Sequence, residues 1–433
     1  MPLVSLKRSP TAGALTKVFA AVLVEDRGRL FKVLIVAAYT IWYLCRARRP
    51  IRLTVPEGLR RIIVACPSLH KSYAPTIYAP TWYGQMLLLA LRELLVWVRP
   101  SPFTRELLTL RDSQVMALDW LEPSPSRPPR AYELPVAVLL HGAFHLSGSR
   151  SSPMIALASS LSAVGCPVVV QNRRGYGVPM TQPRFAFYGD DEDIDEILLR
   201  SVAVRYPGRP IALIGFSAGS NIAFRYSGRL SAGGPLPPGL PRCSCCVVWD
   251  GDPDLDDELV LPRSIESWPV RVALGFLMYS RYYRMNNHVL GRTPSRAEIV
   301  KQLSPTSKVG LQNLLSVHRT HKLLRKLSND FKSPEEYCSR QSFKQYLLSE
   351  TLPPTLLLNS ADDPVCVCGR IESNHREATV RNKRLALAEF ERGAHGAKFG
   401  PLGFGSVVPG IIAEFVEAVT MEHIAASPAC GIF

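Results

Sequence analysis

The chain has 433 residues, of which 47% are hydrophobic and 20% charged. This length and composition are typical of a globular protein with a large core, and they exclude a mainly disordered chain or a small disulfide-stapled one. The formal net charge of +15 favours an anionic membrane surface or a nucleic acid as partner. Because the chain has neither a zinc-finger spacing nor an RNP-like motif, we expect no nucleic-acid partner.

The cysteines indicate a reducing environment. All ten are scattered along the chain, and no Asn-X-Ser/Thr sequon occurs. Both features favour a cytosol-facing domain. Two short groups, Cys243-Ser-Cys245-Cys246 and Cys366-Val-Cys368, invite a metal-site interpretation. The first lies in a predicted buried strand, so we interpret these cysteines as buried thiols and expect no metal.

Residues 1–65 are predicted to form a basic N-terminal segment. Residues 1–61 carry twelve Lys and Arg residues against three acidic ones. Within it, residues 30–45 are the most apolar run, about 16 residues against the roughly 20 that a spanning helix needs. A membrane anchor and an amphipathic helix lying on the domain both explain this run. The arginines that follow it place the bulk of the chain on the cytoplasmic side, and a cleaved signal peptide is disfavoured because no small-residue cleavage site follows.

Further along the chain, short apolar strands alternate with helices. This predicts an α/β fold, a mostly parallel sheet with helices on both faces. A helix over 85–98, interrupted by Arg92-Glu93, is expected to pack on the domain. A hairpin over 105–110 and 115–120 and a loop over 122–135 follow. The later predicted strands are 136–140, 168–170, 211–214, 245–249, 355–358 and 385–390, and the helices are 152–164, 191–206, one after Gly219, and 409–424.

The alternation stops between about 253 and 350. That segment is charged, helical in pattern and poor in strands, which predicts a helical cap inserted in the sheet. Residues 66–425 then form one domain and 426–433 a tail. The tail ends in Cys430-Gly-Ile-Phe433, which has the C-a-a-X form typical of geranylgeranylation, and a frayed end is the alternative interpretation.

One motif dominates the chain: Gly215-Phe-Ser217-Ala-Gly219, between a predicted buried strand and a helix. Strand, G-x-S-x-G and helix together are the context of a nucleophile elbow. Glycines on either side let strand and helix approach, and the helix N-terminus favours negative charge beside the hydroxyl. An ordinary Gly/Ser turn is the alternative. We predict that Ser217 is a nucleophile.

A serine nucleophile needs an adjacent base that is oriented by an acid. In this fold the acid and then the histidine follow the serine, each after a late strand. Asp362-Asp363-Pro364 follows strand 355–358, and His395 lies in a Gly-flanked loop after strand 385–390. We prefer Asp363 to Asp362 because the residue before proline is disfavoured in helical geometry.

Two backbone donors complete the predicted site. The N–H groups of Ala218 and Ala143 are the candidate oxyanion donors. His141, which precedes the Ala143 loop, is expected to be structural. His375 and His423 also follow the acid, but one precedes the last strand and the other lies inside a helix, so neither is preferred as the base.

These residues resemble the YheT-like branch of the α/β-hydrolases, which includes membrane-anchored esterases and phospholipases. The resemblance spans roughly residues 70–425. It implies hydrolysis of carboxylic esters, often of glycerolipids, through Ser217, Asp363 and His395, with no cofactor, and an N-terminal membrane anchor. The matching stretches are Arg105 to Asp112, Leu118-Asp-Trp120, His141-Gly142, Val170-Gln-Asn-Arg-Arg-Gly175, Gly189-Asp190 with Asp193, Tyr206-Pro207, Gly215 to Gly219 with Asn221, Ser333-Pro-Glu-Glu-Tyr337 and Asn359 to Pro364.

The chain departs from this family at two points. It has Gly393-Ala394 where relatives often have Gly-Gly before the histidine, and Ala143 opens a loop that is not Gly-rich. No H-x4-D pattern typical of acyltransferases follows His141 or His395. The sequence therefore predicts a membrane-associated serine hydrolase of lipid esters, on an endomembrane and facing the cytosol. Acyl transfer and an inactive, hydrolase-like binding protein are the alternatives.

Overall fold

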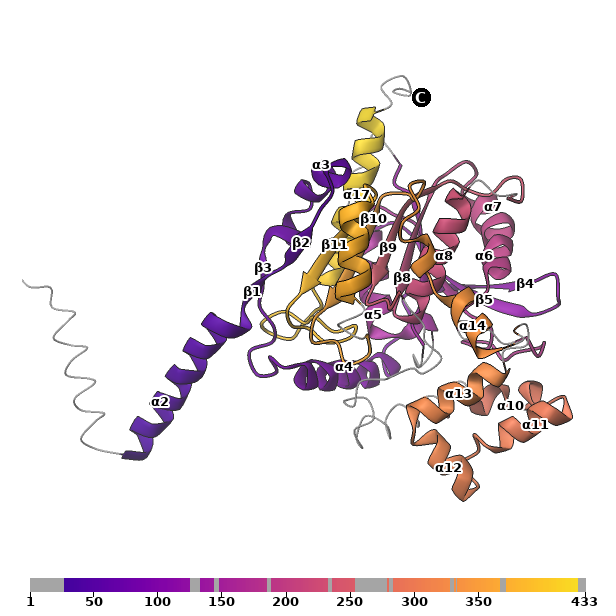
Figure 1. Ribbon diagram of the computed structural model, residues 1–433, viewed down its shortest axis with the longest axis horizontal. Helices are drawn as coiled ribbons and strands as arrows, with labels where there is room; N and C mark the ends of the chain where they lie inside the picture. The colour runs from indigo at the N-terminus through magenta and orange to yellow at the C-terminus, as the bar shows by residue number, and fades with distance from the viewer. Residues whose placement is uncertain are drawn as a thin grey trace, which may run out of the picture. The chain divides into compact units, whose positions relative to one another are not determined.

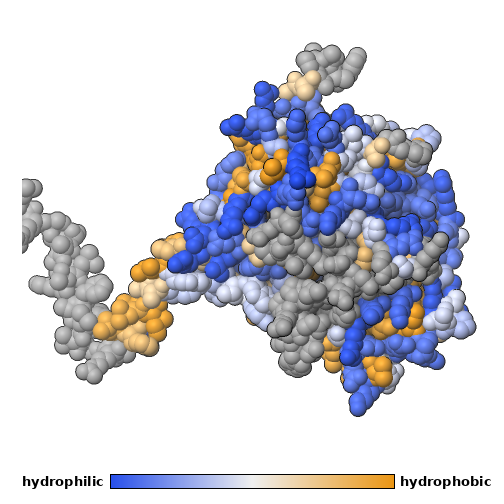
Figure 2. Space-filling view, viewed as in Figure 1, coloured by the Kyte–Doolittle hydropathy of each residue, from blue (hydrophilic) through white to orange (hydrophobic). Residues whose placement is uncertain are grey.

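The computed structural model describes residues 27–124, 133–143, 148–184, 188–232, 236–253, 279, 283–327, 331, 333–366 and 371–426. The chain divides into two compact units, Met1–Arg48 and Arg49–Phe433. In the first unit, helix α2 (Arg27–Trp42) continues into a π-helical turn over Tyr43–Ala47. The helical segment is thus longer than the 16 residues of the predicted apolar run, and its apolar window, Leu30–Ala47, has 18 residues. By length and composition Leu30–Ala47 can cross a membrane, a test that a signal sequence also passes, and Figure 2 colours the helix as hydrophobic.

The second unit is built around a nine-stranded sheet in the order β2-β11-β10-β9-β8-β6-β7-β5-β4. The strands from β11 to β7 run parallel, while β2, β5 and β4 pair antiparallel. All the predicted strands are present, so the predicted sheet is confirmed. Their bounds are β2 Arg52–Thr54, β4 Thr104–Thr109, β5 Val115–Leu121, β6 Val136–Leu140, β7 Val168–Asn172, β8 Ile211–Phe216, β9 Cys243–Trp249, β10 Thr355–Ser360 and β11 Leu385–Phe390.

Strand β2 was not predicted. It lies within the segment that the sequence assigned to the basic N-terminus, and it pairs with β11 from Arg52 to Thr54. With two partly buried residues and one exposed arginine, it lacks the apolar run by which the central strands are recognised. A short, charged strand of this kind is typical of a sheet edge.

Helices cover both faces of the sheet (Figure 1). On one face, α5 (Ser152–Val164) and α17 (Val408–Ala426) pack on alternate strand residues such as Val247. On the other, α6 (Asp191–Ile197) and α8 (Ala218–Ser231) pack on the intervening residues, such as Val248. Successive strand residues point to opposite faces, so a strand that is apolar throughout is buried on both sides. The predicted doubly covered sheet is therefore confirmed.

The described part of the predicted cap, residues 253–350, is helical. It contains α10 (Arg284–Leu290), α11 (Pro294–Lys301), α12 (Lys308–Leu314), α13 (Val317–Leu327) and α14 (Pro334–Gln341), all between β9 and β10 in the chain. Several of these helices share a small core. Residues 254–278 of the predicted cap, most of the predicted loop 122–135, and the tail with Cys430 lie outside the described residues.

Several motifs that carry the family resemblance are ion pairs inside the domain. Arg174 donates to both carboxylate oxygens of Asp193, at 2.8 and 2.6 Å, and to Asp112 at 2.5 Å. Arg105 pairs with Asp119 through two bonds of 2.7 Å. Separating a buried ion pair leaves an uncompensated buried charge, which is costly. Such pairs therefore hold together the segments from which their two residues come. These motif residues therefore have structural partners away from the predicted nucleophile.

Helix α4 (Trp82–Trp97) packs on the domain, as its interrupted apolar pattern predicted. Glu93 accepts the backbone N–H of Ser152 at the start of α5, at 2.8 Å, and Arg92 donates to the carbonyl of Gly403 at 2.9 Å. The second carboxylate oxygen of Glu93 is buried and has no hydrogen-bond partner among the described residues. Burial raises the pKa of Glu93 from 4.5 to about 7.

This pKa predicts a pH-dependent stability. The folded-state pKa of Glu93 is raised, so its contribution is present at low pH and is lost as pH rises through about 7. Glu93→Gln keeps an acceptor for Ser152 but cannot ionise. We expect it to raise the free energy of unfolding by on the order of 1 kcal/mol at pH 8 and much less at pH 5. Thermal unfolding at both pH values measures this, with the exposed Glu57→Gln as control; a pH-independent difference would contradict the prediction.

Candidate active site

Ser217 occupies a strained turn between β8 and α8. Its backbone angles are φ 54° and ψ −123°, a region that non-glycine residues rarely adopt. The two flanking glycines leave no room for a side chain. A Cβ on Gly219 would lie 1.9 Å from the carbonyl oxygen of Leu140, and one on Gly215 would lie 2.3 Å from that of Gly219. The turn is therefore the sharp strand-to-helix turn that the motif predicted, rather than an ordinary Gly/Ser turn.

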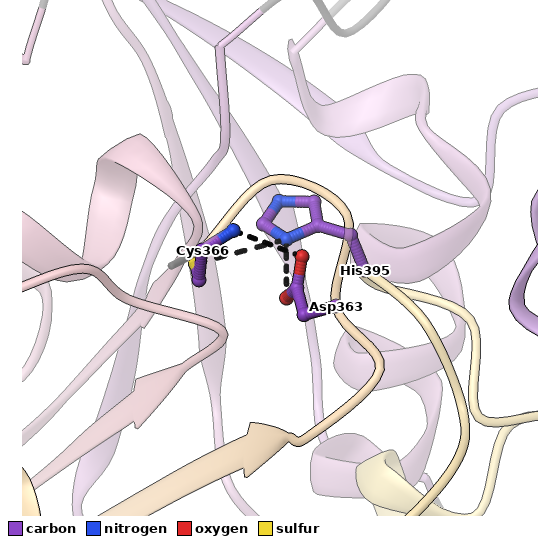
Figure 3. A group of neighbouring side chains, drawn as sticks. All are labelled: Asp363, Cys366 and His395. Atoms are coloured by element: carbon purple, nitrogen blue, oxygen red, sulfur yellow. Dashed lines mark hydrogen bonds and ion pairs between the residues drawn. The ribbon is translucent and has the colours of Figure 1, made fainter. Parts of the chain in front are cut away.

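Three side chains from separate loops meet at this turn. His395 Nε2 lies 2.8 Å from Ser217 Oγ, and His395 Nδ1 lies 2.8 Å from Asp363 Oδ2. The other oxygen of Asp363 accepts the backbone N–H groups of Val365 and Cys366, at 2.7 and 3.0 Å. Figure 3 shows Asp363, Cys366 and His395 together. Asp363 follows β10 and His395 follows β11, so both loops leave the carboxyl end of the sheet where β8 ends. The structure brings together the three residues that the sequence singled out.

The neighbouring acid, Asp362, has a different partner. Its Oδ1 accepts the backbone N–H of Ala394 at 2.9 Å. Asp362 thus bonds the backbone beside His395, while Asp363 bonds the imidazole. This geometry agrees with the preference for Asp363.

Charge couples the histidine to its acid. Burial lowers the pKa of His395, but the charge of Asp363 and its hydrogen bond outweigh burial, and the pKa is raised above its ordinary 6.5. Burial likewise raises the pKa of Asp363, but the charge and hydrogen bond of His395, Lys398 and the Cys366 N–H bring it below 3.8. A neutral imidazole held between a hydroxyl and a carboxylate can accept the hydroxyl proton.

The other two late histidines are differently placed. His375 is fully buried, stacks on Phe343, and has no hydrogen-bond partner at either ring nitrogen among the described residues. Burial lowers its pKa to about 3, so it stays neutral in the core. His423 lies in α17, where burial and then Arg242 and Arg384 lower its pKa. Neither lies in hydrogen-bond contact with Ser217 in the described structure.

Both predicted oxyanion donors pack in one apolar cluster. Ala218 belongs to a buried apolar cluster with Tyr188 and Tyr337, and Ala143 packs against the same cluster. Ala218 begins α8, directly after Ser217. Residues 144–147 of the loop that Ala143 opens lie outside the described residues. The oxyanion role of both alanines stays a prediction.

His141 directly follows strand β6, shortly before Ala143, and its ring is hydrogen-bonded on both sides. It is fully buried, its Nδ1 contacts the carbonyl of Gly142 at 2.7 Å, and its Nε2 accepts the backbone N–H of Arg173 at 3.2 Å. The Arg173 guanidinium also donates to Gly142 at 2.7 Å. With both ring nitrogens hydrogen-bonded to backbone groups, His141 links Gly142 to Arg173, as expected for a structural histidine.

Asp363, Cys366 and His395 form a group of metal-ligating type, with donor atoms within 4.8 Å of one another. The carboxylate and imidazole are already hydrogen-bonded to each other. Burial, and then the nearby carboxylates, raise the pKa of the Cys366 thiol well above 9.0, which opposes the thiolate that a metal requires. The arrangement fits an acid–base pair better than a metal site.

Two residues near His395 were missed from the sequence. Asp250 directly follows β9, and Lys398 lies three residues after His395; both side chains are fully buried and paired with each other. The position of Asp250 could have indicated it, because this residue directly follows a central strand at the edge of the sheet where the other site residues lie. An Asp-Gly turn and a lysine in a loop are ordinarily solvent-exposed, so the local sequence did not predict that these two side chains form a buried pair.

A cavity of about 330 Å³ lies elsewhere. Its lining includes Arg242, Ser244, Pro354 and Arg384, at or just before the starts of β9, β10 and β11. Ser217, Asp363 and His395 instead follow the ends of their strands. Parallel strands place starts and ends at opposite edges of the sheet, so this cavity is distinct from the candidate active site.

Known proteins match most of this domain. The model of the Alpha/beta hydrolase family matches residues 137–400. Human Protein ABHD15 is 28% identical over 178 residues, covering 40% of this chain and 37% of the relative. The medium-chain fatty acid ethyl ester synthase/esterase 2 of Saccharomyces cerevisiae is 28% identical over 288 residues, covering 62% and 57%. The chain thus spans less than two thirds of either relative. The Pyrococcus furiosus esterase PF2001 structure has a TM-score of 0.42 at 15% identity, covering 74% of this chain and 94% of that one.

The strained backbone of Ser217 predicts that two variants lacking the hydroxyl differ in stability. Ser217→Ala and Ser217→Gly both remove the hydroxyl, but only glycine adopts φ 54° without steric cost. We expect the glycine variant to exceed the alanine variant in free energy of unfolding by about 1 kcal/mol, after allowing for the greater backbone entropy of glycine. Denaturant unfolding of the two variants measures the difference. An alanine variant as stable as the glycine one would show that the turn carries no strain.

Proposed function

The chain belongs to the α/β-hydrolase family, and on that premise we propose that it is a serine hydrolase of carboxylic esters. The observation that carries the proposal is the pair of 2.8 Å contacts that links Ser217 Oγ to His395 and His395 to Asp363. Ser217 is the nucleophile, His395 the general base and Asp363 the acid that orients it. An exposed serine without a base is a poor nucleophile at neutral pH, and this relay supplies the base.

The reaction proceeds in two halves. Ser217 Oγ attacks the ester carbonyl while His395 Nε2 takes the hydroxyl proton, and the Asp363 carboxylate stabilises the imidazolium. The N–H of Ala218, with Ala143 as the second donor, stabilises the oxyanion of the tetrahedral intermediate. His395 returns its proton to the leaving alcohol, which departs and leaves an acyl-serine. Water then attacks the acyl-serine, with His395 again accepting and returning a proton, and releases the carboxylic acid.

We infer that the substrate is a lipid ester, an acyl chain of a glycerolipid or phospholipid. The residue after the nucleophile, Ala218, packs in an apolar cluster with Tyr188, Tyr337 and Cys338, so the surroundings of Ser217 are apolar. Apolar surroundings favour acyl chains through the hydrophobic effect. The resemblance to the YheT-like branch, with its phospholipases, and the fatty acid ethyl esters named for the yeast relative support the same class.

Acyl transfer is the second candidate. The yeast relative is named both synthase and esterase, so one protein of this family is described by both directions of the reaction. On the same three residues, an alcohol replaces water in the second half-reaction and the product is a new ester. Comparing hydrolysis with ester formation at added ethanol distinguishes the two.

We propose that Leu30–Ala47 attaches the protein to a membrane. The window is 18 residues long with a mean hydropathy of 1.5, and arginines such as Arg46 and Arg48 stand at its carboxyl end. Cationic side chains at one end of an apolar helix favour the cytoplasmic leaflet on that side. An anchored enzyme meets lipid esters where they reside, which accords with the proposed substrate class.

The catalytic proposal is tested by labelling and turnover of the full chain. We expect a fluorophosphonate probe to label the wild type, and labelling to vanish in Ser217→Ala. With p-nitrophenyl esters, His395→Ala and Asp363→Asn should lower kcat by roughly 10⁴-fold. The matched control is Asp362→Asn, which keeps an acceptor for the Ala394 N–H and should stay within about tenfold of wild type. Loss of activity in Asp362→Asn with an active Asp363→Asn would reverse the assignment of the acid.

The membrane proposal is tested by fractionation. We expect the full chain to remain in the membrane pellet after alkaline carbonate washing, because an apolar helix is held by the hydrophobic effect rather than by charge. A chain lacking residues 1–48 should move to the soluble fraction or be released by high salt. A full chain that carbonate releases would overturn anchoring by this helix and leave an interfacial, charge-dependent attachment.

A further inference from the structure

Directly behind His395, Asp250 and Lys398 form a buried ion pair. Lys398 Nζ lies 2.6 Å from each carboxylate oxygen of Asp250, and both side chains are fully buried. Asp250 comes from the end of β9, while Lys398 belongs to the loop after β11 that carries His395. The pair therefore joins the histidine loop to a strand on the far side of β10.

The pair also bonds the backbone on both sides of His395. Asp250 Oδ2 accepts the N–H of Gly396 at 2.7 Å, and Lys398 Nζ donates to the carbonyl of Ala394 at 3.3 Å. The loop is closed further by the N–H of Lys398, which donates to the carbonyl of Gly393 at 2.9 Å. The residues immediately before and after the histidine are thus both attached to this one ion pair.

The backbone around the pair is strained. Among the described residues, the non-glycine residues with positive φ are Ser113, Ser217, Asp250, Ala394 and Lys398, and four of these five belong to Ser217, the histidine loop or the pair itself. Such conformations persist only where surrounding contacts over-determine them, and they gather at functional sites. The hydrogen bonds of the ion pair to the loop backbone are contacts of this kind, and we interpret them as holding the backbone angles of Ala394 and Lys398.

Stability alone does not account for the pair. Moving two charges out of water costs more than burying two apolar side chains of the same size, so buried ion pairs are weak contributors to folding. What an ion pair supplies is direction, because each oxygen and each ammonium proton needs a partner in a defined place. Here the partners are the backbone groups that flank His395.

We propose that Asp250 and Lys398 are positioning residues that hold the His395 imidazole in line between Ser217 and Asp363. This inference rests on the proposed function, since it gives the Asp250–Lys398 ion pair a role in catalysis by His395. Neither residue touches the ester. They act through the loop, by fixing the two peptide groups on either side of the histidine.

The two charges also oppose each other at the imidazole. After burial and Asp363, which are the larger causes, the Asp250 carboxylate raises the pKa of His395 and the Lys398 ammonium lowers it. Among the described residues, the ring also meets Ser217 Oγ at Nε2, the Cys366 thiol 4.0 Å from Nδ1 and the Phe216 ring, while Asp362 reaches the loop through Ala394. With the pair intact the two charges shift the pKa of His395 in opposite directions, and removing one member leaves the other unopposed.

The test compares Lys398→Met, Asp250→Asn and the double variant with wild type. Catalysis requires neutral His395, so a raised pKa moves the acidic limb of kcat/KM to higher pH and a lowered pKa moves it to lower pH. We expect the limb to move up in Lys398→Met, down in Asp250→Asn, and back toward wild type in the double variant. In that double variant the introduced asparagine amide still offers its oxygen as an acceptor to the Gly396 N–H.

Turnover separates positioning from folding. Rates are expressed per serine that reacts with the fluorophosphonate probe, so that unfolded protein does not count. We expect each single variant to lower kcat by at least about 100-fold while KM changes less than about threefold, with part of the loss recovered in the double variant. A pair that only stabilises the fold would lower the number of reactive sites and leave kcat per site and the acidic limb unchanged, and that result would overturn the proposal.

A readout without turnover keeps this inference distinct from the proposed function. The proton on His395 Nδ1, hydrogen-bonded to Asp363, gives a downfield NMR resonance whose titration reports the pKa of the ring. We expect that titration to shift in opposite directions in the two single variants even if the wild type hydrolyses no ester. If the wild type is inactive but the NMR titration shifts as expected, the proposed esterase function is rejected and the positioning role of the ion pair is retained. If the wild type is active but the titration does not shift, the function is retained and the positioning role is rejected.

Discussion

The close approach of β8 and α8 at Ser217 is the constraint on which the rest of the site depends. The Leu140 carbonyl leaves no space for a side chain on Gly219, and the Gly219 carbonyl leaves none on Gly215. The chain can therefore reverse direction within one residue only by placing Ser217 in a strained conformation, held by its N–H bond to the Trp249 carbonyl at 2.8 Å. The hydroxyl is then carried past the end of the sheet, where loops from neighbouring strands can reach it.

Those loops are brought there by parallel pairing. β8, β9, β10 and β11 are consecutive neighbours in the sheet and run in the same direction, so their carboxyl ends share one edge. Ser217 and His395 are 178 positions apart in the chain, and their contact exists only because the sheet register places the two loops together. The helical segment between β9 and β10 lengthens the separation in sequence without changing which strands are neighbours.

Three buried or partly buried carboxylates surround the one histidine, and each has its own donors. Asp363 bonds the imidazole and two backbone N–H groups, Asp362 bonds the Ala394 N–H, and Asp250 bonds Lys398 and the Gly396 N–H. Like charges this close would normally raise one another's pKa. The pKa of Asp363 is nevertheless lowered, because His395 and Lys398 supply positive charge and the loop supplies hydrogen bonds. The acid next to the base thereby stays ionised.

The sequence alone predicted the strands of the sheet other than β2, the helices over its two faces, the sharp turn at Ser217, and Asp363 and His395 as the partners of Ser217. These follow from local signals: apolar runs of strand length, glycines two positions from a serine, and polar residues directly after a strand. Only the tertiary structure decided that β2 borders β11 and that Asp250 meets Lys398. Each of these depends on which strands are neighbours and in what register. Those properties arise from packing between segments far apart in the chain, and no local pattern encodes them.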